Sequence, residues 1–358
     1  MRYLAADRLH RLSTTILRAL GSTEREASEV ADHLVRANLC GHDSHGVGML
    51  PDYVRMARAG LLVPNQTLAT IVDHQAVLVL DARRGFGQAM AAEAMRRGCS
   101  RARALGAVVV ALRDSCHVGR IGHWAEQCAA EGMASVHFVS VADHDALQAA
   151  YGCSDARLGT NPFCAALPGD DGPAVLLDMA TSAIAFGKAR VARNKGLPVP
   201  EGSVIDRAGR PTTDPTGLVD RHEGALLAFG LHKGSGLAVL CELLAGALSG
   251  GQTIAPHHVK HDSIKNNMLS IIIDVARLGD PRTIAAEIDA LKTWIKASPP
   301  APGFAEVLLP GEPERRSFAQ RAAQGVPVDP KTLNDILAAG ETLGLTRAAL
   351  AELIGGTA

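Results

Sequence analysis

The alternation of apolar runs and helical patterns between residues 76 and 141 constrains the fold most strongly. Three short apolar runs, at 76–82, 107–114 and 133–141, are typical of β-strands. The segments between them, 88–106 and 122–132, are predicted to be helices. Strands that alternate with helices in this way indicate an α/β architecture.

Helical patterns precede this block, and turn-rich sequence follows it. Two helices are predicted at 4–21 and 22–41, the second opened by a capping box between Thr23 and Glu26, and a third runs through 50–60. Later come short strands at 161–169 and 174–180, a hairpin at 203–213, a helical block at 232–251, a strand at 269–275 and further helices towards the C-terminus. Because no linker stands out, we expect interleaved lobes.

Composition excludes several classes of protein. The 358 residues carry 36 Lys and Arg against 37 Asp and Glu, a balance that argues against a nucleic-acid binder. The most apolar run, at 237–248, is short and interrupted by Glu242, so we expect no membrane span, and the N-terminus shows no secretory signal. Seven scattered cysteines without a CxxC pair favour reduced thiols and a cytoplasmic protein.

The segment "GHDSHGVGML" (41–50) gathers two histidines, an aspartate and a serine among three glycines. Such a turn could be a metal site, a catalytic site or an ordinary polar turn. Zinc sites need three or four ligands of compatible geometry, and neither His42-x-x-His45 nor the pair His257-His258 supplies them. We therefore predict no metal site.

Three short motifs resemble well-known signatures but lack essential parts. "LSGGQ" (248–252) matches an ATPase signature, but the chain has no P-loop, so a helix C-terminus stopped by glycine is the better interpretation. "LDARRGFGQAM" (80–90) lacks the third glycine of a Rossmann fingerprint. Cys116 precedes His117, but adjacent residues seldom face each other as a catalytic thiol and base do.

Six stretches in one order are far more specific than any of these motifs. They are "GHDSHGVGMLPDYV", "LRDSCHVGRIGHWAE", "LGTNPF", "LLDMATSAIAFGKAR", "GLHKGSGLAVLCELLAGALSGG" and "LLPGE". Together they resemble the malate/L-lactate dehydrogenase family of non-Rossmann, NAD(P)-dependent 2-hydroxy-acid oxidoreductases. The resemblance spans residues 5 to 345 or so, and it is greatest to a subgroup that shares the forms HDSHGxGM and HxGRIGxWAEQCAA.

The resemblance implies an α/β (α+β) fold: a cofactor domain with a largely antiparallel mixed sheet, and a helical lobe formed by both chain ends. Accordingly, residues 1–115 with 310–358 are expected to form the substrate and dimerisation lobe, and 116–309 the NAD(P)-binding domain. The family also implies homodimers or higher homo-oligomers.

The implied reaction moves a hydride between nicotinamide and C2 of a 2-oxo acid. His117 matches the family's acid–base histidine, and an imidazole suits reversible proton transfer; the alternative is a histidine that merely caps the next helix. Ser44 and His45 match the Ser-His pair that borders nicotinamide and substrate. Most relatives carry a carboxylate-binding arginine where this chain has Met49, and Arg120 is a candidate replacement, with Thr160 a second substrate contact.

The cofactor-binding residues implied by the resemblance come from six segments. "DMATS" is also predicted to run from a strand directly into a helix, whose N-terminal amides would meet a pyrophosphate. NAD is the expected cofactor, with NADP the alternative. The implied residues are His45, Gly119, Arg120, Ile121, Asp178, Met179, Ala180, Thr181, Ser182, His232, Asn266, Leu309, Pro310, Gly311 and Glu312.

These observations favour a reductase of 2-oxo acids to 2-hydroxy acids. Met adapts to irregular apolar shapes, so Met49 indicates phenylpyruvate-like or 2-oxoglutarate-like substrates rather than malate. Two alternatives stay open: a reductase of cyclic imines such as piperideine-2-carboxylate, and a family member that binds ligand without turnover.

Overall fold

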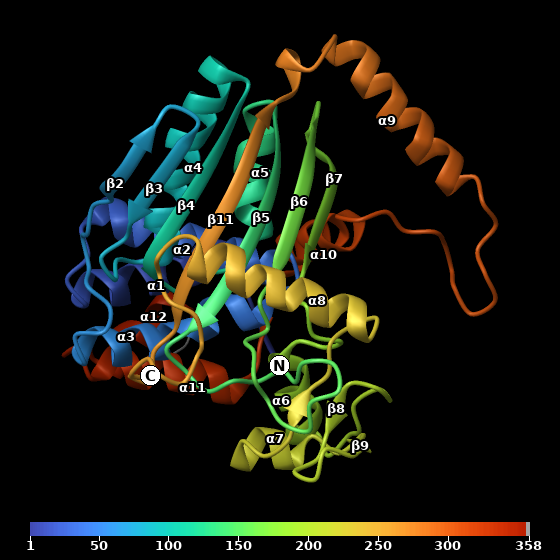
Figure 1. Cartoon of the computed structure of the whole chain (residues 1–358). Coiled ribbons are helices and arrows are strands. Elements are labelled where there is room, and N and C mark those ends of the chain that lie inside the picture. The colour runs from blue at the N-terminus through green and yellow to red at the C-terminus, as the bar shows by residue number, and fades with distance from the viewer. Residues whose placement is uncertain (356–358) are drawn as a thin grey trace.

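The centre of the molecule is a seven-stranded mixed sheet (Figure 1). The computed structural model describes residues 1–355. The strand order is β2-β3-β4-β11-β5-β6-β7, and every neighbouring pair is antiparallel except β3 and β4. The strands are Ala69–His74, Val77–Asp81, Ala107–Cys116, Lys265–Asp274, Met133–Ala142, Phe163–Gly169 and Gly172–Met179, in that order. The predicted α/β fold with a largely antiparallel sheet is confirmed.

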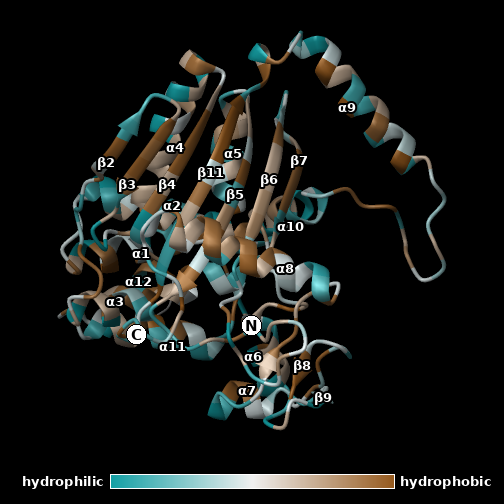
Figure 2. Cartoon of the chain, in the orientation of Figure 1, coloured by the Kyte–Doolittle hydropathy of each residue, from teal (hydrophilic) through white to brown (hydrophobic). Residues whose placement is uncertain are grey.

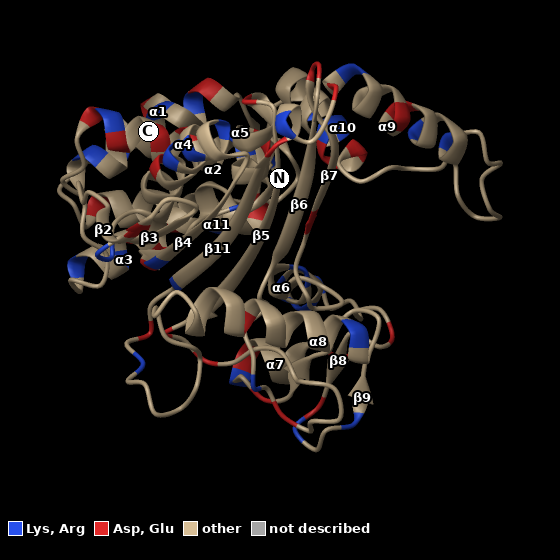
Figure 3. Cartoon of the chain, turned by 45° about the horizontal axis from the view of Figure 1, so that its top comes forward, with Lys and Arg blue, Asp and Glu red and all other residues tan. Residues whose placement is uncertain are grey.

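The connections in the sheet follow from the strand directions. Parallel strands need a long crossover, and α4 (Gly87–Leu105) provides it between β3 and β4. α5 (Gly122–Ala130) connects β4 to β5 and packs on β5, β6 and β7. The strands are largely apolar along their length, whereas charges of both signs are interspersed over the outer helices (Figures 2 and 3). α4 and α5 therefore cover one face of the sheet, while the π-helix (Glu242–Ala247) and α8 (His232–Cys241) contact chiefly β4, β5 and β11 on the other face (Figure 1).

Strand β11 enters the sheet from far along the chain and lies between β4 and β5. The sequence predicted this strand at 269–275, but it begins at Lys265 and ends at Asp274. Asn266 thus belongs to a strand, although it lies outside the predicted range. The residues at the start of β11 are polar and therefore do not resemble a strand in the sequence. They form one because they pair with β4 on one side and β5 on the other.

Both chain ends build one helical lobe, as expected from the resemblance. β1 (Arg2–Leu4) pairs with β12 (Val326–Val328), and helices from the two ends pack together in Figure 1. The predicted domain boundary at 115/116 falls at the end of β4, an inner strand, so the sheet joins the two parts. The helices of the lobe are α1 (Ala6–Ala19), α2 (Glu24–Leu39), α3 (Leu50–Arg58), α10 (Glu312–Gln324), α11 (Pro330–Glu341) and α12 (Arg347–Leu353).

The predicted capping box at α2 is only half formed. The Thr23 hydroxyl accepts the Glu26 amide at 3.4 Å, as predicted. The Glu26 carboxylate does not return the bond: it accepts the amide of Asn65 at 2.8 and 2.9 Å and the Ser22 hydroxyl at 2.6 Å. The Glu26 carboxylate, which the capping box assigns to the start of its own helix, thus binds Asn65 in a loop distant in sequence.

A small lobe lies below the sheet in Figure 1. Its core is a separate apolar cluster around Ala189, Val204 and Leu226. The hairpin predicted at 203–213 is present as β8 (Val204–Ile205) and β9 (Pro211–Thr212). The remaining elements are α6 (Phe186–Asn194), α7 (Thr216–Arg221) and β10 (Ala225–Leu226).

Two helical segments lie outside these lobes. α8 (His232–Cys241) continues into a π-helix, Glu242–Ala247, which ends at the glycines of "LSGG": Gly250 has φ +74° and the Gly251 amide donates to the Gly246 carbonyl at 3.1 Å. α9 (Pro281–Lys296) follows a short 3₁₀ turn (Val275–Arg277) and projects from the body (Figure 1). Within residues 1–355, none of the helices has the length and apolarity to span a membrane.

Candidate active site

Two imidazoles meet at the end of the inner strand β4. His117 directly follows β4, and His45 ends a 3₁₀ helix, Asp43–His45. His117 Nε2 lies 3.1 Å from His45 Nδ1, and the rings stack with centroids 5.2 Å apart. His117 is 7% exposed, whereas His45 is half-buried. The segment 41–50 and His117 are therefore parts of one site.

The close approach of the glycine-rich turn explains its composition. A Cβ on Gly46 would lie 2.1 Å from Asn38 Oδ1, so only glycine fits there. Asn38 in turn accepts the Val47 amide at 2.8 Å and donates to Asp43 at 2.7 Å. The turn continues into a second 3₁₀ helix, Val47–Met49. The turn is thus held rigidly, with Ser44 and His45 at its exposed edge.

Two further residues extend the histidine pair, and the sequence did not indicate them. The Tyr53 hydroxyl of α3 lies 2.7 Å from His117 Nδ1, and Gln88 Nε2 of α4 donates to that hydroxyl at 2.6 Å. Both side chains are 1% exposed. A tyrosine at helical spacing ordinarily belongs to a core, so only tertiary structure shows this contact. Gly87 lets α4 begin here, since its Cβ would lie 2.3 Å from the carbonyl oxygens of Cys116 and His117.

Burial sets the charge state of the site. It holds the pKa of His117 well below the usual value, and the neighbouring His45 lowers it further. Burial also lowers the pKa of His45 to about 4 and raises that of the Tyr53 hydroxyl. Both imidazoles are consequently neutral at pH 7, and a neutral imidazole has one nitrogen able to accept a proton.

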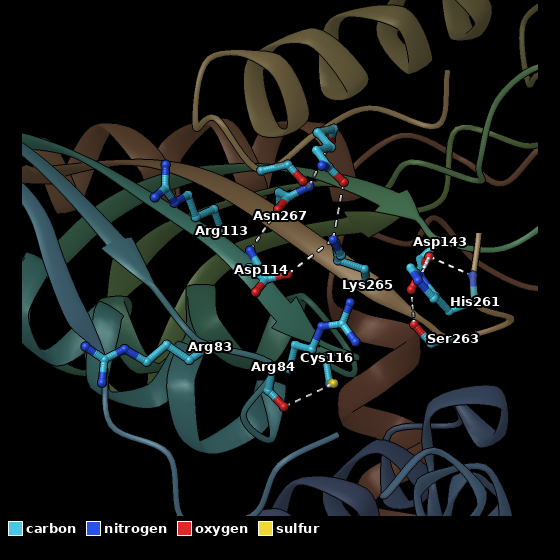
Figure 4. A network of polar contacts seen from close by, with 12 residues as sticks. Arg83, Arg84, Arg113, Asp114, Cys116, Asp143, His261, Ser263, Lys265 and Asn267 are labelled. Atoms are coloured by element: carbon cyan, nitrogen blue, oxygen red, sulfur yellow. Dashed lines mark hydrogen bonds and ion pairs between the residues drawn. The ribbon is translucent and has the colours of Figure 1, made fainter. Parts of the chain in front are cut away.

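The thiol next to His117 is unsuited to nucleophilic catalysis. The Cys116 sulfur donates to the carbonyl oxygens of Leu61 at 3.3 Å and Arg84 at 3.4 Å (Figure 4). Burial raises the pKa of this thiol to about 12. Because the thiolate is the reactive form, Cys116 acts as a small buried side chain.

Polar contacts at the same end of the sheet hold the neighbouring loops (Figure 4). Asp143, directly after β5, accepts the His261 amide at 2.9 Å and the Ser263 hydroxyl at 2.5 Å. Lys265 pairs with Asp114 at 3.2 Å. The loop that follows β5 is thereby bound to the segment that leads into β11.

Arg120 does not occupy the position expected of a substrate ligand. Its guanidinium is buried: Nη2 donates to Glu126 at 2.6 Å, Nε lies 3.3 Å from Asp178, and Nη1 contacts the Cys40 sulfur at 3.4 Å. All three nitrogens thus face protein groups. This geometry argues against Arg120 as the replacement for the arginine missing at Met49, and it indicates a structural role.

The segments predicted to hold the cofactor are brought together around the end of β7. The Gly122 amide, next to Ile121, donates to Asp178 at 2.9 Å. The Pro310 carbonyl accepts the amide of Leu176, two residues before Asp178. The Thr181 carbonyl accepts the amide of Phe229, shortly before His232. Segments 119–121, 178–182, 309–312 and 229–232 are therefore spatial neighbours.

Two predicted cofactor positions lie at the edges of this group. Asn266 is beside His117, since its Oδ1 accepts the Val118 amide at 3.0 Å. Glu312 accepts the Leu309 amide at 3.0 Å and pairs with Lys296 at 2.8 Å. Gly311, with φ +91°, makes the turn between them.

The expectation that "DMATS" runs directly into a helix is wrong. β7 ends at Met179, and α6 begins only at Phe186. The Thr181 amide donates to the Thr160 carbonyl at 2.9 Å, and the Ala183 amide donates to the Leu227 carbonyl at 2.7 Å. No helix N-terminus therefore presents free amides at Thr181, because the Thr160 and Leu227 carbonyls accept the amides of this segment.

One atom in this segment nevertheless fits a bound cofactor. The Ser182 hydroxyl is buried and has no hydrogen-bond partner within the described chain. Buried hydroxyls ordinarily have a partner. Ser182 thus supplies an uncommitted polar group among the segments predicted to hold the nicotinamide nucleotide. A nearby contact joins the two lobes, since a Cβ on Gly187 of α6 would lie 3.1 Å from the Ser44 Cβ.

The fold and site define a pyridine-nucleotide-dependent oxidoreductase of 2-hydroxy acids without a Rossmann fold. The family model for malate/L-lactate dehydrogenase matches residues 4–337, and the chain belongs to this family. Hydroxycarboxylate dehydrogenase B of Escherichia coli (strain K12) is 46% identical over 342 residues, 95% of this chain and 94% of that protein.

Solved structures give the same assignment. A malate/lactate dehydrogenase from E. coli superimposes with a TM-score of 0.95 at 44% identity, covering 99% of this chain and 100% of that one. A Δ1-piperideine-2-carboxylate reductase from Pseudomonas syringae has a TM-score of 0.81 at 26% identity, covering 95% of this chain and 100% of that one. Keto-acid and imine reductases thus share this fold.

Proposed function

We propose that the protein catalyses the reversible reduction of 2-oxo acids to 2-hydroxy acids and that His117 and His45 handle the proton. The buried imidazole pair at the end of β4 carries this proposal. Nicotinamide supplies the hydride when bound, with Ser182, Asn266 and segments 119–121, 178–182 and 309–312 as its holding residues. Positioning of the reactants supplies several kcal/mol of the barrier reduction.

The two histidines differ in what they can reach. His45 is half-buried at the edge of its turn, whereas His117 lies behind it. In the oxidising direction, neutral His117 Nε2 accepts the hydroxyl proton, either directly or through His45. In the reducing direction, the resulting imidazolium returns the proton to the carbonyl oxygen. Burial excludes water from this exchange and preserves the neutral base.

We propose phenylpyruvate-like or 2-oxoglutarate-like substrates. Met49 is half-buried and packs against the main apolar core, which leaves an adaptable apolar surface in place of a guanidinium. Because Arg120 is bound by Glu126 and Asp178, the hydroxyls of Ser44 and Thr160 are the proposed carboxylate contacts. Without a bidentate arginine, selectivity for small dicarboxylates such as malate is expected to be weak.

We propose NAD as the cofactor, a cytoplasmic location and a homodimer. The exposed apolar side chains of α8 and the π-helix support a dimer, since together they form a surface that a second copy would cover: Leu231, Val239, Leu240, Leu243 and Leu248. α9 has no buried residue and exposes Trp294. Sedimentation velocity should show a dimer, and Leu243→Glu should weaken it.

A cyclic-imine reductase is the second candidate, favoured by the likeness to the Δ1-piperideine-2-carboxylate reductase. An imine nitrogen is already basic, so its reduction depends less on a proton donor. His117→Ala therefore separates the two: keto-acid turnover should collapse, and imine turnover should fall much less. His74→Ala, at an exposed position of β2, is the matched control.

The decisive experiment follows oxidation of NADH and of NADPH at 340 nm with phenylpyruvate, 2-oxoglutarate, oxaloacetate, pyruvate and a cyclic imine. Turnover of bulky or dicarboxylic keto acids, lost in His117→Ala, supports the proposal and shows the preferred cofactor. Turnover of the imine alone assigns the second function. Binding of NADH without turnover of any substrate indicates a non-catalytic member of the family.

A further inference from the structure

Four side chains from different parts of the chain form one continuous line of hydrogen bonds. Gln88 of α4 donates to the hydroxyl of Tyr53 on α3 at 2.6 Å, Tyr53 contacts His117 Nδ1 at 2.7 Å, and His117 Nε2 contacts His45 Nδ1 at 3.1 Å. Three of the four are at most 7% exposed. Water therefore has little part in deciding where the hydrogens lie.

The direction of this line decides which nitrogen of His117 carries its proton. When the Gln88 amide nitrogen faces Tyr53, it donates to the hydroxyl oxygen, and the hydroxyl donates to His117 Nδ1. Neutral His117 must then hold its proton on Nε2, towards His45. In that state Nε2 is unable to accept a proton from a substrate.

The other end of the amide gives the opposite direction. Gln88 Oε1 is buried and has no hydrogen-bond partner within the described chain, an unusual state for a buried carbonyl oxygen. Turning the amide by half a rotation brings Oε1 to Tyr53 with no change of shape. The hydroxyl then donates to Oε1, its oxygen accepts the hydrogen bond of His117 Nδ1–H, and Nε2 carries no proton, so it can accept one directly or through His45.

We propose that Gln88 and Tyr53 are positioning residues that set the tautomer of His117, and that turning of the Gln88 amide prepares His117 to accept the substrate proton. This inference rests on the proposed function of His117. The protonated imidazolium also needs Nδ1–H to face an acceptor, so the same amide direction serves both catalytic states. One proton moves from substrate to Nε2, and no other bond is formed or broken in the line.

Within the described chain, none of the titratable groups around His117 changes its charge near neutral pH, so the line of hydrogen bonds determines the tautomer of His117 there. The titratable neighbours are His45, Tyr53 of α3, the preceding Cys116 and His33 of α2. Burial lowers the pKa of His45 to about 4 and that of His33 well below its usual value, and it raises those of the Tyr53 hydroxyl and the Cys116 thiol. The Tyr53 hydroxyl thus keeps its proton, and the direction of its bond to Gln88 determines the direction of its bond to His117.

Gln88→Glu, Tyr53→Phe and the double variant test the proposal in the whole enzyme. Glutamate has the shape of glutamine but presents only oxygens when ionised, so it should fix the base form and raise the pKa of His117. The acid limb of kcat/KM for hydroxy-acid oxidation should move up by about one pH unit or more. Tyr53→Phe should lower kcat by roughly 10- to 100-fold, part of what a positioned base contributes, with KM unchanged because neither residue touches substrate.

The double variant is the critical one. If Tyr53 carries the effect, its pH profile should match that of Tyr53→Phe alone. A Gln88→Glu profile equal to wild type, or an equal shift in the double variant, would overturn the proposal. Gln88→Met tests the same hydrogen bond without a buried carboxylate, which could by itself prevent folding. Because Met is uncharged and of similar length, this variant should fold and should lower kcat as Tyr53→Phe does.

A measurement without turnover separates this inference from the proposed function. In ¹⁵N-histidine-labelled enzyme, the His117 signals are those lost in His117→Gln. Wild type should show a single tautomer, and Tyr53→Phe a mixture of two. A mixture in wild type refutes the inference whatever the activity. Full activity of His117→Ala, in contrast, refutes the proposed role of His117 and leaves the tautomer result standing.

Discussion

Replacing Glu126 by Gln tests whether Arg120 is a structural ion-pair partner or a substrate ligand. Glu126 accepts a 2.6 Å bond from Arg120, whose side chain is 1% exposed, and a 2.9 Å bond from Arg36, which is 42% exposed. Breaking a buried pair costs about 3–5 kcal/mol because one charge stays buried without its partner.

The magnitude should lie at the lower end of this range. Arg120 keeps Asp178 at 3.3 Å, and the solvated Arg36 contributes only about 0–1 kcal/mol. We therefore expect the free energy of unfolding to fall by about 3 kcal/mol. The control is Glu131→Gln, which removes an exposed 3.1 Å pair with Arg103 and should cost about 0–1 kcal/mol.

Urea unfolding followed by tryptophan fluorescence is a suitable assay. Trp124 is buried beside His33 in the same cluster, whereas the other tryptophan, Trp294, is 75% exposed and should change little. Arg120 holds the pKa of Glu126 below its usual value, so this stabilisation is present above the unfolded pKa and is lost as pH falls through the folded one. The difference between wild type and Glu126→Gln should shrink accordingly.

The reasoning fails if Glu126→Gln and Glu131→Gln have equal unfolding midpoints. It also fails if Glu126→Gln lowers the KM for the oxo acid, because release of Arg120 would strengthen substrate binding only if Arg120 bound the substrate carboxylate. The second result would restore Arg120 as the replacement for the arginine missing at Met49.

Four further predictions follow from the site. Cys116→Ser should keep kcat within about 3-fold of wild type, since a buried thiol with a pKa of about 12 is inert; a 100-fold loss in a steady-state assay would make the thiol catalytic. The acid limb of kcat/KM for oxidation should lie below pH 6.5, the usual value for histidine, because burial keeps His117 and His45 neutral. For the same reason, the free energy of unfolding should fall below that pH, because the histidines of the unfolded chain bind protons there and the buried imidazoles of the folded chain do not. An unfolding free energy that is constant from pH 7 to 5 would contradict this. Gly119→Ala, whose Cβ would lie 2.0 Å from His33 Nε2 at φ +75°, should lower the unfolding free energy by about 2 kcal/mol or more, whereas Gly236→Ala in open space on α8 should not; equal thermal midpoints would refute this.

The sequence by itself determined the elements whose signal is local. Apolar periodicity located β3, β4, β5 and the helices between them, and glycine together with turn residues located the β8–β9 hairpin. The ordered motifs indicated the family and singled out His117 and His45. The predicted elements are confirmed because each depends on residues within a few positions of one another, and the family model confirms the family.

Tertiary structure decided whatever depends on partners far along the chain. The Asn65 amide takes the Glu26 carboxylate from its capping box, and pairing with the Thr160 carbonyl removes the free amide expected at Thr181. Glu126 and Asp178 occupy Arg120, a residue that sequence pattern alone offered to the substrate. Tyr53 and Gln88 join His117 only because the fold brings α3 and the first turn of α4 to the end of β4. Hydrogen bonds and ion pairs act over about 3 Å in space, and spacing along the chain carries no record of that distance.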